Sequence, residues 1–195
     1  KKMPSAGLVP VGQLSFLPIP VGAQSVGENY TSVTDDRLIN PEEHNWLSYR
    51  GTLDGWGYSK LDQINDTNID ELQPVWSFST GVLGGHESPP IVNDGVMFIT
   101  TPGNFLYAIE AATGDLLWRY QHNLPENYIA FHRTNRGVAL YGDKVYMATL
   151  DARVIALDAT TGEKVWDTPV QDNSFGYYIT MAPLAIDGKI LVGTS

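Results

Sequence analysis

The sequence predicts an all-β fold, a β-propeller built from four-stranded antiparallel blades. The first observation is an internal repeat, because residues 108–118 recur as residues 156–166 with five of the eleven positions identical. Repeats of roughly 40–50 residues made of short strands are typical of propeller blades, which stack around a common axis. The second observation is composition, because 19 Gly, 12 Pro, 10 Tyr, 6 Phe and 5 Trp favour strands joined by tight turns over helices.

The N-terminal stretch shows neither a helical nor a strand period and is rich in Pro and Gly. We therefore predict an extended arm over residues 1–35, followed by the first propeller blades over residues 36–195. Lys1-Lys2, followed by apolar residues that end at Val21-Gly22-Ala23, also loosely resembles a signal peptide. Four prolines within that stretch oppose a helical signal core. The arm and the retained signal peptide stay open as alternatives.

In the segment between the arm and the repeats, the sequence predicts two short helices and one strand. A helix is expected to start at Asn40-Pro41-Glu42-Glu43, where Asn provides a cap and Pro occupies the first helical position. Residues 67–70 form a second capping signature, which predicts a helix of one or two turns through Leu72. Residues 75–79 then have the composition of a strand.

From Ser88 onward the chain repeats one pattern, two apolar stretches separated by a tight turn. The three copies are residues 88–100, 137–149 and 182–194, with turns at Asp94-Gly95, Gly142-Asp143 and Asp187-Gly188. Asp and Gly tolerate the positive φ angles of two-residue hairpins, so each copy predicts a hairpin. After the first two copies, a third strand ending at Ala108 or Ala156 and a fourth ending at a Trp complete a four-stranded blade.

The tryptophan that ends each repeat has a predicted packing role. A large flat side chain fills the gap between twisted neighbouring sheets, so Trp76, Trp118 and Trp166 are expected to be structural, with Trp118 and Trp166 buried between blades. A propeller removes its sheet edges by closing on itself. The chain holds two full repeats and the start of a third. We therefore expect the remaining blades to come from polypeptide outside these residues.

Charge and cysteine content exclude several classes of function. The net charge is −10 and no basic run extends beyond Lys1-Lys2, which argues against a nucleic-acid partner. The sequence contains no Cys, so a disulfide framework, a zinc-thiolate site and a covalently attached haem are excluded within these 195 residues.

Three polar residues occupy equivalent positions in successive repeats. Glu87 precedes the first strand of the first repeat, Arg136 precedes that of the second, and Thr180 that of the third. Equivalent positions point at the same end of a propeller axis, so the three side chains are expected to form a ligand site. The guanidinium of Arg136 suits a planar anionic ligand, because its fork pairs bidentately with carboxylates. Each residue taken alone also has a structural interpretation.

The chain resembles the quinoprotein alcohol dehydrogenases, a family of eight-bladed propellers that bind pyrroloquinoline quinone (PQQ) with a metal ion. The resemblance runs from about Val33 to Ser195 and includes the repeated Trp motif. It is carried by Asn45-Trp46, Tyr49-Arg50-Gly51, Gly57-Tyr58-Ser59, Gln63-Ile64-Asn65, His86-Glu87-Ser88-Pro89, residues 134–139 and residues 179–183. The Trp motif alone occurs in non-enzymatic propellers too, so these segments in this order are the more specific signal.

The resemblance implies four cofactor-binding residues. Glu87 and Arg136 match family contacts, with Arg136 beside the quinone oxygens as the group that stabilises developing oxyanion charge. Thr180 and Ser195 match residues that bind the carboxylates of the cofactor. The metal ligands and the catalytic base of the family lie beyond the position of Ser195, so the resemblance assigns no metal ligand and no catalytic base within this chain.

The implied function is that of a periplasmic oxidoreductase, which oxidises an alcohol or polyol by hydride transfer to metal-bound PQQ. The implied metal is Ca²⁺ or a lanthanide ion. The implied partners are the alcohol, the rest of the propeller polypeptide and a separate electron acceptor such as a cytochrome c. Assembly as a homo-oligomer stays open.

Two alternatives to that enzyme stay open. One is a non-catalytic PQQ-repeat propeller that acts as a scaffold or assembly protein. The other is a catalytically dead homologue, because Ala130-Phe131 stand where many family members carry adjacent cysteines joined in a disulfide.

Overall fold

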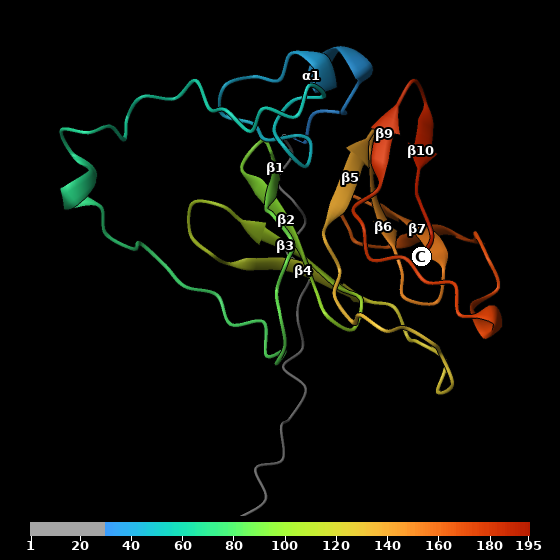
Figure 1. Ribbon diagram of the computed structural model, residues 1–195. Helices are drawn as coiled ribbons and strands as arrows, with labels where there is room; N and C mark the ends of the chain where they lie inside the picture. The colour runs from blue at the N-terminus through green and yellow to red at the C-terminus, as the bar shows by residue number, and fades with distance from the viewer. Residues whose placement is uncertain (1–29) are drawn as a thin grey trace, which may run out of the picture.

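Antiparallel sheets make up most of the regular structure in the computed structural model, which describes residues 30–195 (Figure 1). The first four-stranded sheet contains β1 (Ile91–Asn93), β2 (Val96–Thr101), β3 (Phe105–Glu110) and β4 (Leu116–Gln121). The second contains β5 (Val138–Tyr141), β6 (Lys144–Ala148), β7 (Arg153–Asp158) and β8 (Lys164–Pro169). A third sheet has two strands, β9 (Leu184–Ile186) and β10 (Lys189–Leu191).

The two four-stranded sheets are structural copies of each other. In both, the strands pair in chain order, and every pairing is antiparallel. Even the irregularities match, because the register shifts between Ala108 and Ile109 in the first sheet and between Ala156 and Leu157 in the second. The repeat in the sequence is thus a repeat of backbone geometry, and the prediction of four-stranded propeller blades is confirmed.

The predicted hairpin turns are confirmed. Asp94 and Gly95 have φ angles of 49° and 80°, and Asp187 and Gly188 have 49° and 68°. Two successive positive φ angles match the twist of the flanking strands. At the second turn only Gly142 is positive, with φ 63°, which is the form that needs Gly at the first central position.

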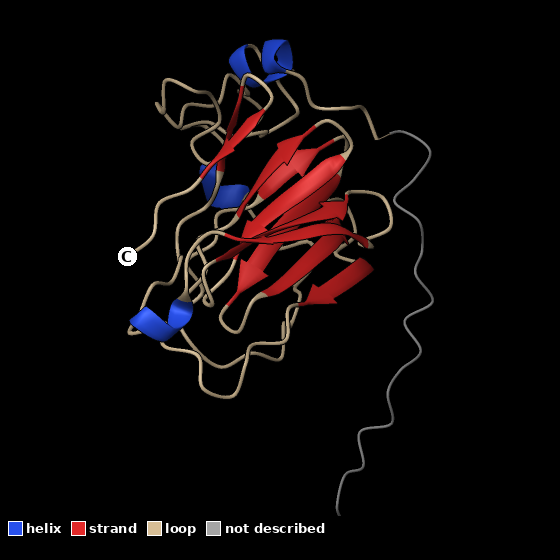
Figure 2. Cartoon of the chain, turned by 90° about the vertical axis from the view of Figure 1, so that its right-hand side faces the viewer, coloured by secondary structure: helices blue, strands red, loops and turns tan. Residues whose placement is uncertain are grey.

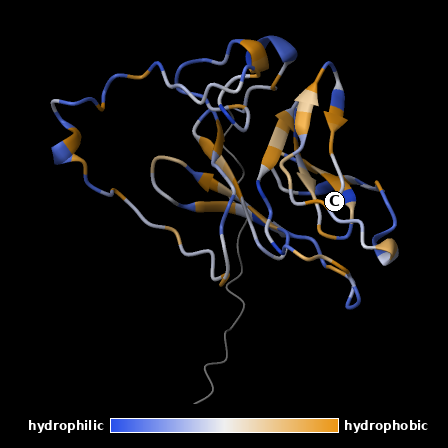
Figure 3. Cartoon of the chain, in the orientation of Figure 1, coloured by the Kyte–Doolittle hydropathy of each residue, from blue (hydrophilic) through white to orange (hydrophobic). Residues whose placement is uncertain are grey.

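Hydrophobic residues follow the strands, whereas the connecting loops are largely hydrophilic (Figure 3). The apolar core lies between the sheets and includes Phe98 and Leu140, both fully buried. Trp118 joins it at 2% exposure, with its ring 5.9 Å from that of Phe98. Seen from the side, the strands lie in the middle of the molecule and the short helical turns lie around them (Figure 2).

The prediction that Trp166 is buried is wrong in this structure, because 38% of the residue is exposed. Its ring lies 5.8 Å from that of Tyr146 in its own sheet. In contrast to Trp118, it meets no Thr-Gly turn of a following repeat within the described residues. Its strand is the outermost of the second sheet, and nothing described packs on its far side.

The helix expected to begin at Asn40 in fact ends there. Helix α1 spans Asp35–Ile39, and the side chain of Thr34 caps it by accepting from the N–H of Arg37 at 3.4 Å. Thr34 followed by Asp35 and Asp36 is the stronger start signal, because acidic residues in the first turn favour the helix dipole. Pro41 disfavours helical geometry at Asn40, so the chain leaves the helix at that point.

The second predicted helix is a single 3-10 turn, η1, at Ile69–Glu71, in a long loop that swings away from the sheets (Figure 1). The strand expected at residues 75–79 is absent, since those residues pair with no strand among the described residues. Trp76 instead packs on the first sheet, where its Nε1 donates to the carbonyl of Ala111 at 3.1 Å. Residues with the composition of a strand do not form one unless another strand is available to pair with them.

The segment before the sheets is fastened to both of them. Val33 bridges to Gly142 beside the second sheet, and Trp46 bridges to Val92 in the first. Residues 1–29, which hold most of the arm predicted over residues 1–35 and all of its signal-peptide alternative, lie outside the described residues. The division of the chain at residue 35 stays a prediction. Across residues 30–195 no helix is both long and apolar enough to cross a membrane.

Candidate functional site

The three residues predicted at the end of the axis are brought together. Arg136 lies between the other two, with its Nη2 2.9 Å from Oε2 of Glu87. Its Nη1 donates to Oγ1 of Thr180 at 2.6 Å. These contacts join three successive repeats, because Glu87 and Thr180 lie 93 residues apart in the sequence yet both contact Arg136.

Local structure explains why these side chains meet. Each residue lies a few positions before the first strand of its sheet, namely β1, β5 or β9. The backbone N–H of Arg136 also donates to the carbonyl of Thr180 at 2.9 Å, which ties the approach to β5 to the approach to β9. The convergence therefore follows from repetition of one backbone path.

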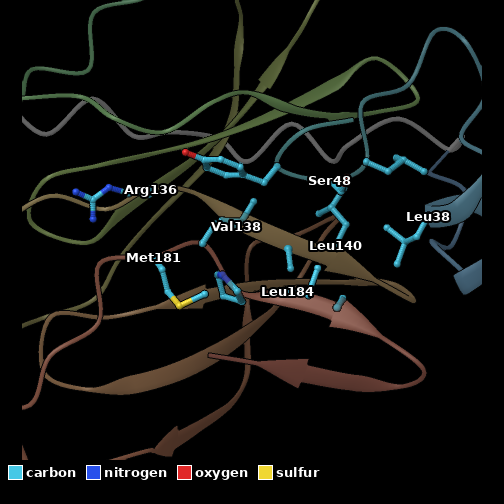
Figure 4. A pocket seen from close by; sticks show the side chains of 13 residues that line it. Leu38, Ser48, Arg136, Val138, Leu140, Met181 and Leu184 are labelled. Carbon is cyan, nitrogen blue, oxygen red and sulfur yellow. The ribbon is translucent and has the colours of Figure 1, made fainter. Parts of the chain in front are cut away.

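Arg136 stands at one end of an apolar cavity of about 340 Å³ that runs between β5 and β9. Figure 4 shows Val138 and Leu140 following Arg136 along β5, with Met181 and Leu184 on the facing segment. The guanidinium and Met181 lie at one end of this row, and Leu38 of helix α1 lies at the other (Figure 4). An apolar wall on one side of Arg136 limits the directions from which a polar ligand can approach.

A second, more open cavity of about 560 Å³ is lined by Arg136 and Glu87 together. Its lining also includes Arg133, whose guanidinium carbon lies 5.6 Å above the ring of Tyr128. Two arginines and one glutamate leave a surplus of positive charge at this cavity, although the whole chain has a net charge of −10. Such a local excess favours an anionic ligand.

An exposed aromatic ring completes this cavity. Phe131 is 83% exposed, and its ring lies 6.4 Å from that of Tyr178 in an edge-to-face arrangement. A phenyl ring left open to solvent offers a flat apolar face for stacking. It occupies one of the two positions where many family members have cysteines.

Ser195, the fourth predicted cofactor residue, is not joined to the other three. Its backbone pairs with Tyr178, by bonds of 3.0 Å and 3.4 Å, and its side chain is exposed. No hydrogen bond within residues 30–195 links it to Arg136 or Thr180. Its role at the cofactor stays a prediction.

Sequence reasoning missed two polar groups, one buried and one partly buried. Asn135 is 1% exposed and bonds to both four-stranded sheets through its side chain. His122 and Asp151 form the other, with Nε2 2.9 Å from Oδ2. Burial raises the pKa of the Asp151 carboxyl, but hydrogen bonds from His122 and Thr149 outweigh it and hold the pKa below its usual value. The repeat pattern predicts neither of these contacts, although Asn135 lies in one of the segments that carry the family resemblance.

The donor set fits a planar polyanion better than a bare metal ion. Arg has five N–H groups, and Glu87 and Thr180 engage only two of them, so others are available to a carboxylate or quinone oxygen. About 39% of the Arg136 side chain is exposed, which leaves it reachable from the open cavity. Within the part of the chain that is described, no three His, Asp or Glu side chains gather as metal ligands.

The chain is similar in sequence to several quinoproteins. Quinoprotein alcohol dehydrogenase PedH of Pseudomonas putida is 37% identical over 174 residues, which cover 87% of this chain and 29% of that protein. A quinoprotein ethanol dehydrogenase of Pseudomonas aeruginosa is 44% identical over 136 residues, or 68% of this chain and 22% of that protein. The chain thus spans less than a third of the length of these relatives.

Solved structures agree with the sequence relationship. Quinohemoprotein alcohol dehydrogenase ADHIIG of Pseudomonas putida HK5 superposes with a TM-score of 0.79 at 36% identity, covering 85% of this chain and 25% of that one. A europium-containing methanol dehydrogenase gives 0.77 at 36% identity, covering 82% and 29%. The family model for the glucose/ethanol/alcohol dehydrogenase β-propeller domain matches residues 46–194. The chain therefore belongs to the PQQ-dependent alcohol dehydrogenase family, as part of its β-propeller domain.

Proposed function

We propose that this chain forms part of the cofactor site of a periplasmic, PQQ-dependent dehydrogenase of alcohols or polyols. The observation that carries the proposal is the contact of Arg136 with both Glu87 and Thr180. Those residues match three cofactor contacts of the family, and they meet beside a cavity with surplus positive charge. The periplasmic location rests on the family resemblance alone.

Arg136 is the group that we assign to the quinone oxygens. Bound PQQ with its metal ion supplies the hydride acceptor for the alcohol. Arg136 is held from two sides, so its free N–H groups are oriented before any ligand arrives. Donors that are fixed in advance stabilise charge that develops on an oxygen without reorganising during the reaction.

Thr180 and Phe131 have supporting roles in this proposal. The hydroxyl of Thr180 accepts from Arg136, and its own proton is available to a carboxylate of the cofactor. Phe131 presents an exposed ring from the same cavity, which suits stacking on a planar ligand. The residues present thus fit PQQ, and the aromatic face stands where the resemblance would place a disulfide.

The remaining parts of the active site are proposed to lie outside these residues. They are the metal ligands, the base that accepts the alcohol proton, and Ca²⁺ or a lanthanide as the metal. The solved europium-containing methanol dehydrogenase supports testing a lanthanide alongside Ca²⁺. A separate electron acceptor such as a cytochrome c is also proposed, on the family resemblance.

The test is purification of the complete protein, reconstitution with PQQ and either Ca²⁺ or a lanthanide, and removal of unbound cofactor. We expect the absorbance of a retained quinone and dye reduction that depends on an added alcohol. Retained quinone without alcohol-dependent reduction would favour the catalytically dead homologue. Failure to retain PQQ with either metal would overturn the proposal and favour the scaffold.

A further inference from the structure

We infer that the buried side chain of Asn135 is a positioning residue, which fixes the segments carrying Arg136 and Glu87 relative to each other. This inference rests on the proposed function, because the site being positioned is the proposed PQQ site. Asn135 lines neither of the two cavities beside Arg136 and is 1% exposed. It therefore acts through its neighbours and not by touching the cofactor.

The side-chain amide of Asn135 joins the two four-stranded sheets. Its Oδ1 accepts from Oγ1 of Thr100 in β2 at 2.8 Å and from the N–H of Gly137 at 3.0 Å. Its Nδ2 donates to the carbonyl of Ala148 in β6 at 2.9 Å. One buried group thus connects a strand of the first blade to a strand of the second, directly beside Arg136.

The same hydrogen-bond chain continues to the segment that carries Glu87. The N–H of Thr100 donates to Oγ of Ser88 at 3.1 Å, and Ser88 follows Glu87 in the sequence. A continuous series of hydrogen bonds therefore connects the backbone at Arg136 to the backbone at Glu87 through Asn135, Thr100 and Ser88. Movement at Asn135 is expected to change the distance between Arg136 and Glu87.

Packing around Gly137 shows how tightly these segments meet. Gly137 has φ +116°, and a Cβ at this position would lie 3.4 Å from Oγ of Ser88 and 3.8 Å from Cβ of Ala182. The segments before β1, β5 and β9 thus converge on one residue. These are ordinary van der Waals distances, and the hydrogen bonds of the buried amide add fixed directions to this contact.

The energetic argument separates Asn135 from an ordinary polar residue. A buried hydroxyl or carbonyl left without its partner is penalised by its full loss of solvation. Removing the Asn135 amide would leave the Thr100 hydroxyl with only its longer contact of 3.4 Å to the backbone carbonyl of residue 135, and it would take the amide donor from the carbonyl of Ala148. The structure is expected to relax by shifting the approach to β5. Shifts on the order of 1 Å at a positioned group reduce function about 100-fold in enzymes.

The experiment compares three variants of the complete protein. Asn135→Ala removes the connection, and Thr100→Val removes the hydroxyl partner with little change of shape. Asn93→Ala is the matched control, because Asn93 is 0% exposed, donates to the carbonyl of Thr31 and accepts from Arg37. That control removes a comparable buried amide from the first blade, in contact with the N-terminal segment and not with Arg136.

The first measurement is the dissociation constant of PQQ for each apoprotein, together with its melting temperature. We expect Asn135→Ala to weaken PQQ binding about tenfold or more and Thr100→Val about threefold. Asn93→Ala is expected to lower the melting temperature while leaving the dissociation constant within about twofold of the wild type. Wild-type affinity in both test variants, or equal weakening in the control, would overturn the positioning role.

The second measurement needs no cofactor. Phenylglyoxal modifies exposed guanidinium groups, and mass spectrometry reports its rate at Arg136. We expect modification of Arg136 to accelerate in Asn135→Ala and Thr100→Val and to be unchanged in Asn93→Ala. Unchanged rates in all three variants would contradict the inference. If the wild type binds no PQQ, the proposed function fails, while this rate still decides whether Asn135 positions Arg136. Thr100→Val keeps both measurements decisive if Asn135→Ala does not fold.

Discussion

Trp118 and Trp166 end the same repeated sequence, yet they have opposite environments. Trp118 is 2% exposed, and its Nε1 donates to the carbonyl of Ala159 at 3.1 Å. Trp166 is 38% exposed, and its ring lies 5.8 Å from that of Tyr146 in its own sheet. The difference shows that the environment of such a tryptophan is set by the repeat that follows it, and not by the strand that carries it.

The glycines of the Thr-Gly turns contact the tryptophans of the preceding repeats. A Cβ at Gly162 would lie 2.6 Å from Trp118, and a Cβ at Gly114 would lie 2.7 Å from Trp76. Each Thr-Gly turn thus receives the tryptophan that precedes it by one repeat. This contact between a tryptophan and the turn of the next repeat joins consecutive blades. The hydrogen bonds within one sheet make no such connection between blades.

The largest expected effect is that of Trp118→Ala. Loss of a fully packed indole should lower the free energy of unfolding by about 3–5 kcal/mol. Trp166→Ala should lower it by less than about 1.5 kcal/mol in any preparation of residues 1–195 that stays folded and monomeric, since part of that residue is already in water. Urea unfolding of both variants provides the comparison. Equal losses would show that each strand, and not the next repeat, determines the contribution of its tryptophan.

That comparison requires residues 1–195 to unfold cooperatively, which is itself a test. We predict that they do not form a stable monomer alone, because the second sheet leaves an open edge and an exposed Trp166. Light scattering of the isolated segment measures this. If the segment aggregates, the two variants are compared in the complete protein, where we expect a following repeat to cover Trp166 and make the two losses similar.

A smaller effect is expected from Gly162→Ala. The new methyl would collide with Trp118, and the backbone has φ +73°, so we expect a loss of about 3 kcal/mol. Gly176→Ala is the matched control, since φ is +89° there but nothing lies within 4 Å of the added Cβ. The control should lose only the conformational part, about 1–2 kcal/mol. Thermal unfolding measures the loss of stability in both variants. Equal losses would show that the contact between the turn and Trp118 contributes nothing to stability.

Repetition explains how much of this molecule the sequence could predict. Hairpins at Asp94-Gly95 and Asp187-Gly188 depend on local backbone preferences, so short patterns were enough. The meeting of Glu87, Arg136 and Thr180 followed from their equivalent positions in three repeats, with no contact between them visible in the sequence.

Failures occurred where the outcome depended on a distant partner or on competing local signals. Residues 75–79 have a strand composition but no strand beside them among the described residues, and Trp166 lacks the turn that buries Trp118. At α1 two start signals overlap within ten residues, and the Thr34 cap prevailed over Asn40. The segment that contains Asn135 contributed to the family resemblance, but the repeat pattern does not indicate that its amide is buried between two blades.

The smallest expected effect is that of Glu42, which lies in the segment that contacts both blades. Hydrogen bonds from Arg37 and Asn45 lower the pKa of the Glu42 carboxyl from 4.5 to about 2. Arg37 in turn donates to Asn93 beside the first hairpin, whereas the second blade is held through Val33 and Gly142. Glu42 is partly exposed, so its contribution is reduced by solvent screening.

Because the folded pKa is depressed, Glu42 stabilises the fold fully above about pH 4.5 and loses this contribution as the pH falls toward 2. The difference in unfolding free energy between wild type and Glu42→Gln should therefore be constant near neutral pH and shrink over that window. Denaturation at several pH values measures it. A difference that stays constant down to pH 2 would rule out the ion pair with Arg37 as the first blade's fastening.

The most direct test of the account is a PQQ titration of the complete apoprotein carrying changes at Arg136, followed by turnover at saturating cofactor. We predict that Arg136→Ala weakens binding and lowers turnover, and that Arg136→Lys recovers more of the affinity than of the rate, because Lys keeps the charge but loses the fork. Thr180→Val should weaken binding with little change in rate. Arg119→Ala is the control, an exposed arginine whose guanidinium carbon lies 5.9 Å over Phe105, and it should change neither value. Full affinity and full turnover in Arg136→Ala would contradict the claim that equivalent positions of three repeats build the cofactor site.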